Sequence, residues 1–428
     1  MNKKLLVVGF SIALVITTII SSISLAAPPS LIVSTNEAKI AAQDKITIFA
    51  SEMEWDVMSS IGDPIQYYTP DGVEAAYEYP VETNGKDTGF ILVSARKDWM
   101  PVLEWSDGIA PSSLVEYARE SAIEEGYLEK GDNSEPTFYY WGAFTYSVQF
   151  GKKMKQERVV ISLKNGQVTK LPKNAPKLQM DTSKAQNQWN NLIGDESKHP
   201  IKSLVNTLFQ GSKVKANADV SQPQSQELGQ TIYNVGGVPC FYQGWYVTMH
   251  GDDHDGDADE YPDCVGYPDD LWNDYDGCAP IAGAMILGYW SEQGYTNIPD
   301  PDAGETEDIL IDHCHGRMGT WDDGTTSPDS NIVSGLEYIT DTMYGYDFAY
   351  GYGGVDWDWA KQQINYGRPF VLSAADFEGG DDHAVCVYGY SDSSPYSLHV
   401  WNTWNTNNHW VQYGDWYAAN VIGVAGGY

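Results

Sequence analysis

Cys278 begins the most informative segment of the sequence, in which a turn dipeptide precedes a long uncharged run. Asp276-Gly277 is typical of a turn, and Pro280 is best tolerated in the first turn of a helix. Residues 281–290 carry no charge, so we expect a helix that begins at Cys278 and is buried on most sides. The helix dipole would stabilise a thiolate there, and the Cys278 N–H would face a developing oxyanion. A buried structural cysteine is the alternative.

His383 is the second residue whose type and position could serve catalysis. A polar, Gly-rich turn at 378–382 precedes it and the apolar run 384–390 follows, so we expect His383 at the first position of a strand. Because side chains alternate between the two faces of a strand, His383 and Val385 share one face. Cys386 belongs to the other face and is expected in the core. A capping or core histidine is the alternative.

Asn402 lies in the next expected strand, residues 397–404. A hairpin would bring the Asn402 amide close to His383, where it would orient the imidazole ring while Trp404 shields that bond from water. Asn402 as a plain turn former at a strand end is the alternative. Cysteine catalysis needs a thiolate, a base and a group that orients the base, and Cys278, His383 and Asn402 fit these roles.

The elements that must position these residues belong to the aromatic, Gly- and Asp-rich part of the chain, residues 229–428. Residues 27–172 indicate a separate small α+β module. Its expected helices are 37–61 and 112–125, and its expected strands are 75–81, 89–95, 101–105, 138–150 and 158–163, the last two as an antiparallel pair. Residues 173–228 are rich in Lys, Asn, Gln, Ser and Asp; we expect a linker with a processing site and a helix within 187–209.

Bulk properties narrow the class of protein. A chain of 428 residues suits two domains and a linker, and 42% hydrophobic residues exclude a disordered chain. The net charge of −34 repels nucleic acid and anionic lipid, so neither is an expected partner. Residues 1–26 are typical of an export signal, with an uncleaved membrane anchor as the alternative. No later stretch is apolar enough to span a bilayer, so we expect a secreted, soluble mature chain without stable membrane insertion.

Five cysteines leave at least one thiol unpaired, or paired between molecules: Cys240, Cys264, Cys278, Cys314 and Cys386. Cys240 and Cys264 bracket an acidic loop, which a disulfide between them would clamp. His313 and His315 flank Cys314 and suggest zinc, but no second Cys or His cluster lies at metal-ligand spacing. A disulfide from Cys314 to Cys386 is the other interpretation.

The acidic loop lies within residues 251–260, where Gly256 permits a tight turn between alternating acidic residues: Asp253, Asp255, Asp257 and Asp259. Carboxylates spaced around a glycine suit a hard cation, so the loop predicts a structural Ca²⁺ site, and a solvated acidic loop is the alternative. The loop resembles the Asp-rich calcium loops of dockerin or thrombospondin repeats, without an EF-hand glutamate at the twelfth position. Catalysis is expected to need no cofactor.

The C-terminal motifs resemble the papain-like fold, and within it the bacteriocin-processing-peptidase-like family. The matching segments are Gly-Cys-Ala-Pro-Ile-Ala-Gly-Ala-Met at 277–285, Gly-Tyr-Trp at 288–290, Gly-Arg-Pro-Phe-Val-Leu-Ser at 367–373, His-Ala-Val-Cys-Val-Tyr-Gly-Tyr at 383–390 and His-Val-Trp-Asn-Thr-Trp at 399–404. This resemblance implies an α+β fold in which a central helix that bears the cysteine packs on an antiparallel sheet. Residues 229–428 would form that peptidase domain.

The N-terminal module resembles a streptopain-type pro-region in its segments 75–81, 89–95 and 101–106. This resemblance implies a zymogen, in which the module inhibits the enzyme until the linker is cut. The family also carries a glutamine before the cysteine that completes the oxyanion hole. Here Trp272 stands six residues before Cys278, and Gln243 or Asn273 are the nearest amides. Gln243 is favoured, which makes the residues between it and Cys278 an insertion.

Together these features predict a secreted cysteine endopeptidase that cleaves peptide or protein substrates through an acyl-enzyme. Cys278 would be the nucleophile, His383 the base, Asn402 its orienting partner and Gln243 the oxyanion amide. Two alternatives stay open. One is amide hydrolysis or transamidation of another substrate at the same site, and the other is a non-catalytic extracellular binding protein with a relic site.

Overall fold

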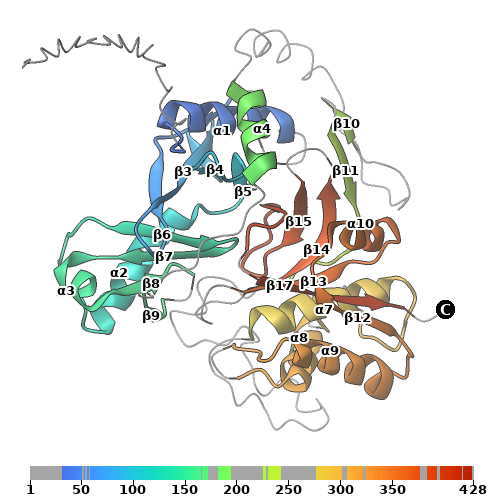
Figure 1. The fold of residues 1–428 in the computed structure, drawn as a ribbon. Coiled ribbons are helices and arrows are strands. Elements are labelled where there is room, and N and C mark those ends of the chain that lie inside the picture. Colours follow the sequence, from blue (N-terminus) through green and yellow to red (C-terminus); the bar gives the residue numbers. More distant parts are fainter. Residues whose placement is uncertain are drawn as a thin grey trace, which may run out of the picture.

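The computed structural model describes residues 31–426 apart from 51, 52, 54, 57, 165, 172–181, 194–224, 228, 229, 242–275, 301–305, 322, 323, 376–382, 393–395 and 417. Within these residues, 31–193 form the part that we call the N-terminal module, and 225–426 form the C-terminal domain (Figure 1). No helix in the described ranges is long and apolar enough to cross a membrane.

The N-terminal module is a mixed α/β unit. Its elements are α1 (Thr35–Phe49), β1 (Ser59–Ile61), β2 (Ile65–Tyr68), β3 (Glu74–Thr83), β4 (Lys86–Ser94), β5 (Val102–Ser106), the 3₁₀ turn η1 (Pro111–Leu114), α2 (Val115–Glu124), β6 (Thr137–Gly142), β7 (Thr145–Gln149), α3 (Gly151–Glu157), β8 (Val159–Ser162), β9 (Val168–Lys170) and α4 (Thr182–Ile193). β1 to β5 and β6 to β9 form antiparallel runs that the parallel β2–β6 pair joins.

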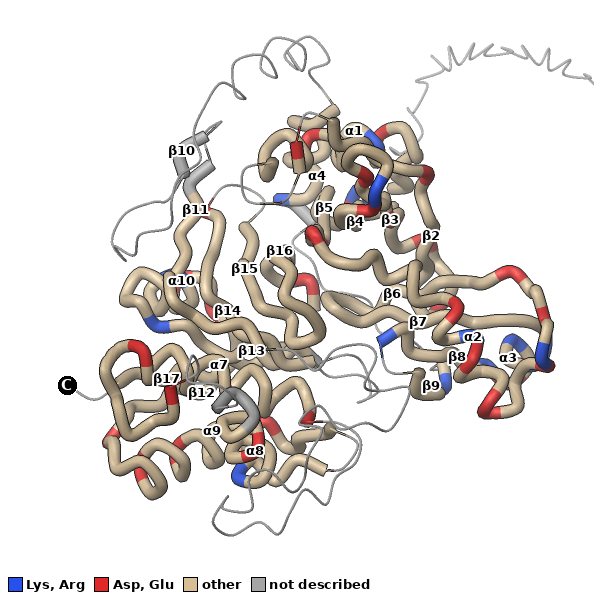
Figure 2. The backbone as a smooth tube through the Cα atoms, turned by 180° about the vertical axis from the view of Figure 1, so that it is seen from behind, with Lys and Arg blue, Asp and Glu red and all other residues tan. Residues whose placement is uncertain are grey.

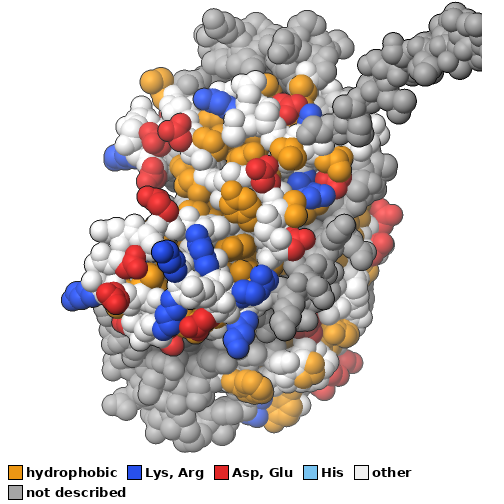
Figure 3. All heavy atoms as spheres, turned by 60° about the vertical axis from the view of Figure 1, so that its left-hand side comes forward, with side chains coloured by type: hydrophobic (Ala, Val, Ile, Leu, Met, Phe, Trp, Pro, Cys, Tyr) orange, Lys and Arg blue, Asp and Glu red, His pale blue; other side chains and the backbone are white. Residues whose placement is uncertain are grey.

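Helix α4 lies in the segment expected to be a linker, and it packs back on the module. Trp189 is 1% exposed within the core that α1 and β3 to β5 share. Its indole donates a hydrogen bond to the Trp99 carbonyl over 2.9 Å. Figure 3 shows the module's face of the molecule, where Lys and Arg side chains lie among Asp and Glu.

Two predicted elements of the module have different boundaries. The helix expected over 37–61 ends at Phe49, because the Asp56 carboxylate accepts from Met58 N and the Ser59 hydroxyl from Asp56 N. Such local bonds compete with helix formation, and β1 follows. The strand expected over 138–150 is a hairpin, β6 and β7, whose tip includes Phe144 at φ 66°.

The C-terminal domain has helices on its sheet (Figure 1). Its elements are β10 (Ser225–Glu227), β11 (Gln230–Asn234), α7 (Cys278–Glu292), α8 (Thr306–Met318), α9 (Ser330–Glu337), the π-helical turn η2 (Tyr338–Met343), β12 (Ala349–Gly354), α10 (Trp357–Asn365), β13 (Phe370–Ala375), β14 (His383–Ser391), β15 (Ser397–Trp401), β16 (His409–Gln412) and β17 (Ala418–Ala425). Its strand pairs are antiparallel.

Helix α7 is the buried centre of this domain. Every residue from Ala279 to Ser291 is buried, in agreement with the uncharged run in the sequence. The helix packs on β14 and β13, and the core around it includes both faces of β14. A helix that begins at Cys278 and lies on a mostly antiparallel sheet is the arrangement that the sequence predicts for the C-terminal domain.

One strand pair joins the two parts into a continuous sheet. β5 of the module pairs antiparallel with β16 of the C-terminal domain, with Trp105 opposite Trp410. The two indoles stack at 5.8 Å with their planes 5° apart. The β6–β7 tip also reaches across, since Ala143 N donates to the Asp415 carbonyl over 2.7 Å. The module is therefore docked on the domain through both backbone and side chains.

Candidate active site

Cys278 is the first residue of α7 and is half-buried. Gly277 before it has φ 92°, a conformation that favours glycine and turns the chain sharply into the helix. The Cys278 sulfur accepts a hydrogen bond from the Ala384 N–H of β14 over 3.3 Å. The helix N-terminus and this N–H both favour negative charge on Sγ.

His383 is the first residue of β14, as the sequence predicts, and is 1% exposed. Since Ala384 directly follows it, the strand brings the histidine backbone next to the Cys278 sulfur. Yet these two described residues share no hydrogen bond between Sγ and the imidazole. Both ring nitrogens are engaged elsewhere, one within the C-terminal domain and one by the module.

The Nε2 nitrogen of His383 contacts the loop after β15. His383 Nε2 lies 2.8 Å from the Asn402 carbonyl oxygen and 3.0 Å from Trp404 Nε1. The indole of Trp404 stacks on the imidazole at 5.6 Å with a 21° tilt. The sequence predicts Asn402 and Trp404 beside His383, and the structure brings all three together.

The contact from Asn402 comes from its backbone, whereas the sequence analysis assigns that role to its side-chain amide. The Asn402 Oδ1 instead accepts hydrogen bonds from the N–H groups of Trp404, over 3.1 Å, and Asn405, over 3.3 Å. Thr403 follows in the left-handed region at φ 65°, and its hydroxyl donates to the Asn402 carbonyl over 2.6 Å. The side chain thus builds the turn that points the Asn402 carbonyl at the imidazole.

The outer nitrogen of the ring is capped by Lys164 from the N-terminal module. The ammonium lies 2.8 Å from His383 Nδ1 and 4.5 Å from the centre of the Trp404 ring. An ammonium has only donors, so Nδ1 accepts from Lys164. Nε2 faces both an acceptor, the Asn402 carbonyl, and a donor, the Trp404 indole N–H. Lys164 follows β8 and is buried, and Phe144 of the same module lies edge-on to the imidazole at 5.6 Å.

These surroundings keep His383 neutral. Burial, and then the Lys164 charge, hold the pKa of His383 well below 6.5, with a further push from His409. The Asn402 carbonyl acts in the opposite direction and is outweighed. A pocket of about 40 Å³ lies beside the ring, between the two parts of the molecule. Its lining includes Lys164, Phe144, Asn402, Trp404 and His409.

A buried polar cluster lies beside this pocket at the joint between module and domain. The Glu104 carboxylate accepts hydrogen bonds from the Tyr146 hydroxyl over 2.6 Å and lies 3.0 Å from His409 Nε2. The Tyr140 hydroxyl donates to the Asp415 carboxylate. Burial, and then Glu104, raise the pKa of Asp415 well above 3.8. The joint therefore contains groups whose charges depend on whether the module is docked.

Several predicted site residues lie outside the described residues. These are the candidate oxyanion amides Gln243 and Asn273 and the four predicted calcium ligands, Asp253, Asp255, Asp257 and Asp259. Within the described ranges, His, Cys, Asp and Glu side chains form no group that could hold a metal ion. His313 and His315 have different partners, the Tyr344 hydroxyl and the Asp276 carbonyl.

The disulfide offered as one interpretation of Cys314 and Cys386 is wrong. Cys314 and Cys386 are both buried and both free, because Cys314 packs on α7 at Gly283 whereas Cys386 lies in the middle of β14. Burial raises the pKa of both thiols, which makes them inert core residues. Cys240 is also free, with its thiol 3.8 Å from the Asn405 carbonyl, and Cys264 lies outside the described residues.

The comparisons with known proteins agree with this geometry. Residues 264–421 match the Peptidase C39-like family. The matched range contains Cys278, His383 and Asn402, and it leaves out the N-terminal module. At family level the match is a similarity to cysteine peptidases, whose substrates are peptides or proteins. No curated protein matches the chain significantly.

Lys164 and Phe144 are the site residues that the sequence analysis does not find. Lys164 is one of 25 Lys and Arg residues in the chain and follows an ordinary predicted strand. Phe144 falls inside the segment expected to be one unbroken strand. The aromatic run around it conceals the turn, and no turn dipeptide with Gly in second place marks it.

Proposed function

We propose that the chain is the precursor of a secreted cysteine endopeptidase. The observation that carries this proposal is the hydrogen bond between Cys278 Sγ and the N–H of Ala384, because it joins the helix-terminal thiol to the strand that begins with His383. The family match over residues 264–421 supports the same chemistry. The export signal within residues 1–26 is the basis for secretion.

In the proposed reaction the Cys278 thiolate attacks the carbonyl carbon of a peptide bond. His383 takes the thiol proton at Nδ1, the nitrogen not used by Asn402, and gives it to the leaving amine as the C–N bond breaks. The Cys278 N–H and the Gln243 amide stabilise the oxyanion. Water then attacks the acyl-enzyme, its proton passes through His383, and the thiol is regenerated.

We propose that the N-terminal module inhibits this reaction through Lys164. Its ammonium takes the lone pair on Nδ1 that must accept the Cys278 proton. It also opposes the imidazolium that would result, because two like charges about 4 Å apart cost roughly 4 kcal/mol at an effective dielectric constant of 20. The uncleaved chain is then a latent form, and activation requires Lys164 to leave the pocket.

Basic residues are distributed unevenly along the chain. Residues 229–428 hold three of the 25 Lys and Arg residues but 32 of the 59 Asp and Glu residues. Most basic residues therefore lie in the N-terminal part, as the backbone view in Figure 2 illustrates for the described residues. Residues 1–228 nevertheless hold 22 basic against 27 acidic residues (25 − 3 and 59 − 32), so it is the Lys164 ammonium and not net charge that complements the acidic domain.

The proposal includes a structural Ca²⁺ ion in the acidic loop at 251–260. Four alternating aspartates within it provide the oxygen donors that calcium prefers. The loop lies in the long insertion before Cys278, so the cation would stabilise the segment that leads into α7. It would take no part in catalysis.

Self-processing tests the nucleophile and latency together. The purified precursor is incubated with about 1 to 10 mM Ca²⁺ or with a chelator, because extracellular calcium modules bind with dissociation constants of about 10⁻⁴ to 10⁻³ M. Cleavage within residues 173–228 is followed by mass spectrometry. We expect wild type to process itself and Cys278→Ala to stay intact. Cys240→Ala, which changes a free thiol outside the site, is the control. Processing by Cys278→Ala at the wild-type rate would exclude Cys278 as the nucleophile.

A further inference from the structure

Helix α8 sends one buried side chain to the turn in front of the nucleophile. His315, 2% exposed, has its Nδ1 2.8 Å from the backbone oxygen of Asp276. A carbonyl oxygen only accepts hydrogen bonds, so Nδ1 of His315 must carry the proton and donate. This bond fixes the peptide plane between Asp276 and Gly277, two residues before Cys278.

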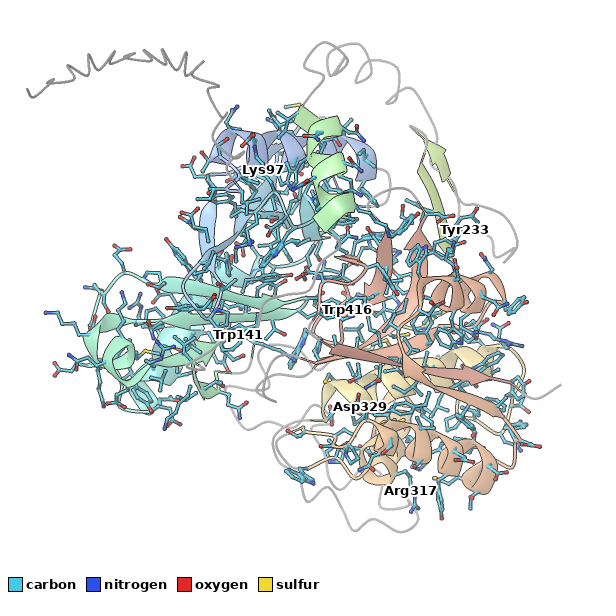
Figure 4. The ribbon with its side chains drawn as sticks, viewed as in Figure 1. Lys97, Trp141, Tyr233, Arg317, Asp329 and Trp416 are labelled. Carbon is cyan, nitrogen blue, oxygen red and sulfur yellow. The ribbon has the colours of Figure 1, made fainter. Side chains whose placement is uncertain are left out.

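Close packing of two helices brings His315 to this place. A Cβ atom at Gly283 of α7 would lie 2.6 Å from the Met318 methyl group and 3.3 Å from the Cys314 sulfur. Glycine at 283 therefore lets α8 approach α7 closely. Figure 4 labels Arg317, in the last turn of α8, at the lower edge of the C-terminal domain. The residues at this end of α8 face the first turn of α7.

The segment after α8 holds the same turn from a second side. Thr320 N donates to the His315 carbonyl over 3.1 Å, which folds the chain back toward α7. A Cβ atom at Gly277 would lie 2.5 Å from the Gly324 carbonyl oxygen and 3.1 Å from the Thr320 methyl group. Gly277 is thus enclosed between the His315 bond on one side and Thr320 and Gly324 on the other.

This turn decides where the nucleophile points. Gly277 has φ 92° and ψ 143°, so a small rotation of the preceding peptide would reorient the Cys278 N–H and Cα–Cβ bonds. Both atoms of the proposed chemistry, the oxyanion donor and Sγ, depend on that orientation. A misplacement of about 1 Å at a reacting atom costs on the order of 10²-fold in rate.

We propose that His315 is a positioning residue for Cys278, acting through its hydrogen bond to the Asp276 carbonyl. The proposal rests on the assignment of Cys278 as the nucleophile. His315 touches neither the sulfur nor the base, and its neighbour on α8, His313, holds Tyr344 instead. The role needs one N–H donor at the Nδ1 position and nothing else from the imidazole.

Two substitutions of His315 distinguish the role of its N–H donor from that of the imidazole ring as a whole. The Asn side chain offers an N–H close to the Nδ1 position, so His315→Asn should retain the bond to Asp276, whereas His315→Leu removes it and fills the space. His313→Leu is the control on the same helix, because it removes a half-buried imidazole that bonds to Tyr344 and not to the turn. Circular dichroism and thermal unfolding of each full-length variant measure the loss of stability separately.

The first readout is alkylation of Cys278 by iodoacetamide in the full chain, measured at that residue by peptide mapping. We expect His315→Leu to slow it by about one order of magnitude or more, while His315→Asn and His313→Leu stay near wild type. The second readout is the activity of the processed enzyme, where we expect His315→Leu to lower kcat with little change in KM.

The outcomes distinguish two failures. Equal alkylation rates in His315→Leu and wild type, with wild type active, would overturn the positioning role. So would an identical slowing in the Asn and Leu variants that follows their loss of stability. If no variant cleaves any peptide but alkylation still depends on the donor at 315, the endopeptidase proposal fails while the positioning of Cys278 stands.

Discussion

The N-terminal module and the C-terminal domain bury polar groups of different kinds. The module buries carboxylates among hydroxyl donors, as in Glu78, which accepts from Tyr67 over 2.7 Å and from Ser112. The C-terminal domain buries imidazoles among carbonyls and rings, as in His383 and His399. His399 stacks on Trp410 at 4.1 Å, and burial lowers its pKa to about 3.

The contrast matters where the two parts meet. Each part places some of its buried ionisable groups at the joint. Glu104 of the module lies against His409 of the domain, and Lys164 of the module lies against His383. The first pair attracts when the histidine is charged, whereas the second repels. The same docked module can therefore hold the domain firmly and still oppose the charged form of its base.

The largest effect is expected from removal of the Lys164 charge, which opposes protonation of His383. Lys164→Ala frees Nδ1 of His383 while the β5–β16 pair still docks the module. We expect reactivity of the uncleaved chain toward a peptide-based thiol inhibitor to rise by about 10²-fold, the size of one general-base contribution. The measurement is the labelling rate of the full-length band on a gel, so processed enzyme does not contribute.

Lys170→Ala is the matched control, because Lys170 lies on β9 of the same module and is exposed. It should label at the wild-type rate. Lys164→Met is the second variant, since it keeps the length of the side chain without the charge. If Lys164→Met stays latent, the bulk of the side chain and not its charge explains the low reactivity. Repulsion between Lys164 and protonated His383 would then not be the cause of latency.

The second largest effect concerns the turn that begins at Asn402 and points the Asn402 carbonyl at His383. Asn402→Ala removes the Oδ1 acceptor that orders the turn, so the Asn402 carbonyl is no longer held toward the ring. We expect kcat of the processed enzyme to fall by about tenfold, because a mispositioned base costs rate. Asn402→Asp keeps an acceptor at Oδ and should retain most of the activity.

A side-chain role for Asn402 predicts a different pattern. If the amide N–H or oxygen contacted the imidazole directly, Asn402→Asp would shift the pH profile of kcat, because a carboxylate would raise the pKa of His383. We expect that shift to be absent. A clear shift in the Asp variant, with the Ala variant unaffected, would return the orienting role to the side chain.

Much of this site could be predicted from sequence because its elements are set by local patterns. The uncharged run after Gly277 indicates α7, and the apolar run after a Gly-rich turn indicates β14, so Cys278 and His383 are assigned correctly to the first positions of their elements. The β14–β15 hairpin that brings Asn402 to His383 also follows from short-range signals.

The remaining features depend on contacts that local patterns do not encode. Lys164 lies 219 positions before His383, and only the docking of the module brings them together. Whether a side chain or a carbonyl of Asn402 faces the ring depends on the left-handed conformation of Thr403. The wrong Cys314–Cys386 disulfide has the same origin, because spacing along the chain does not show that these two residues belong to different layers.

The smallest expected effect is the dependence of module docking on pH. It is small because protonation of His383 and protonation of Asp415 act on docking in opposite directions. His383 faces Lys164, His409 and the Asn402 carbonyl, and its depressed pKa means that the open form binds a proton first as the pH falls below 6.5. Acid therefore favours opening through His383. Asp415 faces Glu104 and Tyr140, and its raised pKa means that the closed form keeps a proton above pH 3.8, so acid favours closure there.

Hydrogen exchange of the β5 and β16 amides, corrected for intrinsic rates, reports opening of the joint. Between pH 7 and pH 5 we expect opening of the wild type to change by only about threefold. Asp415→Asn removes the opposing proton and should increase the acid response to about tenfold, whereas Lys164→Met should weaken it because His383 then has an ordinary environment on one side. An Asp415→Asn variant that opens less readily in acid than wild type would reverse the sign assigned to this carboxyl.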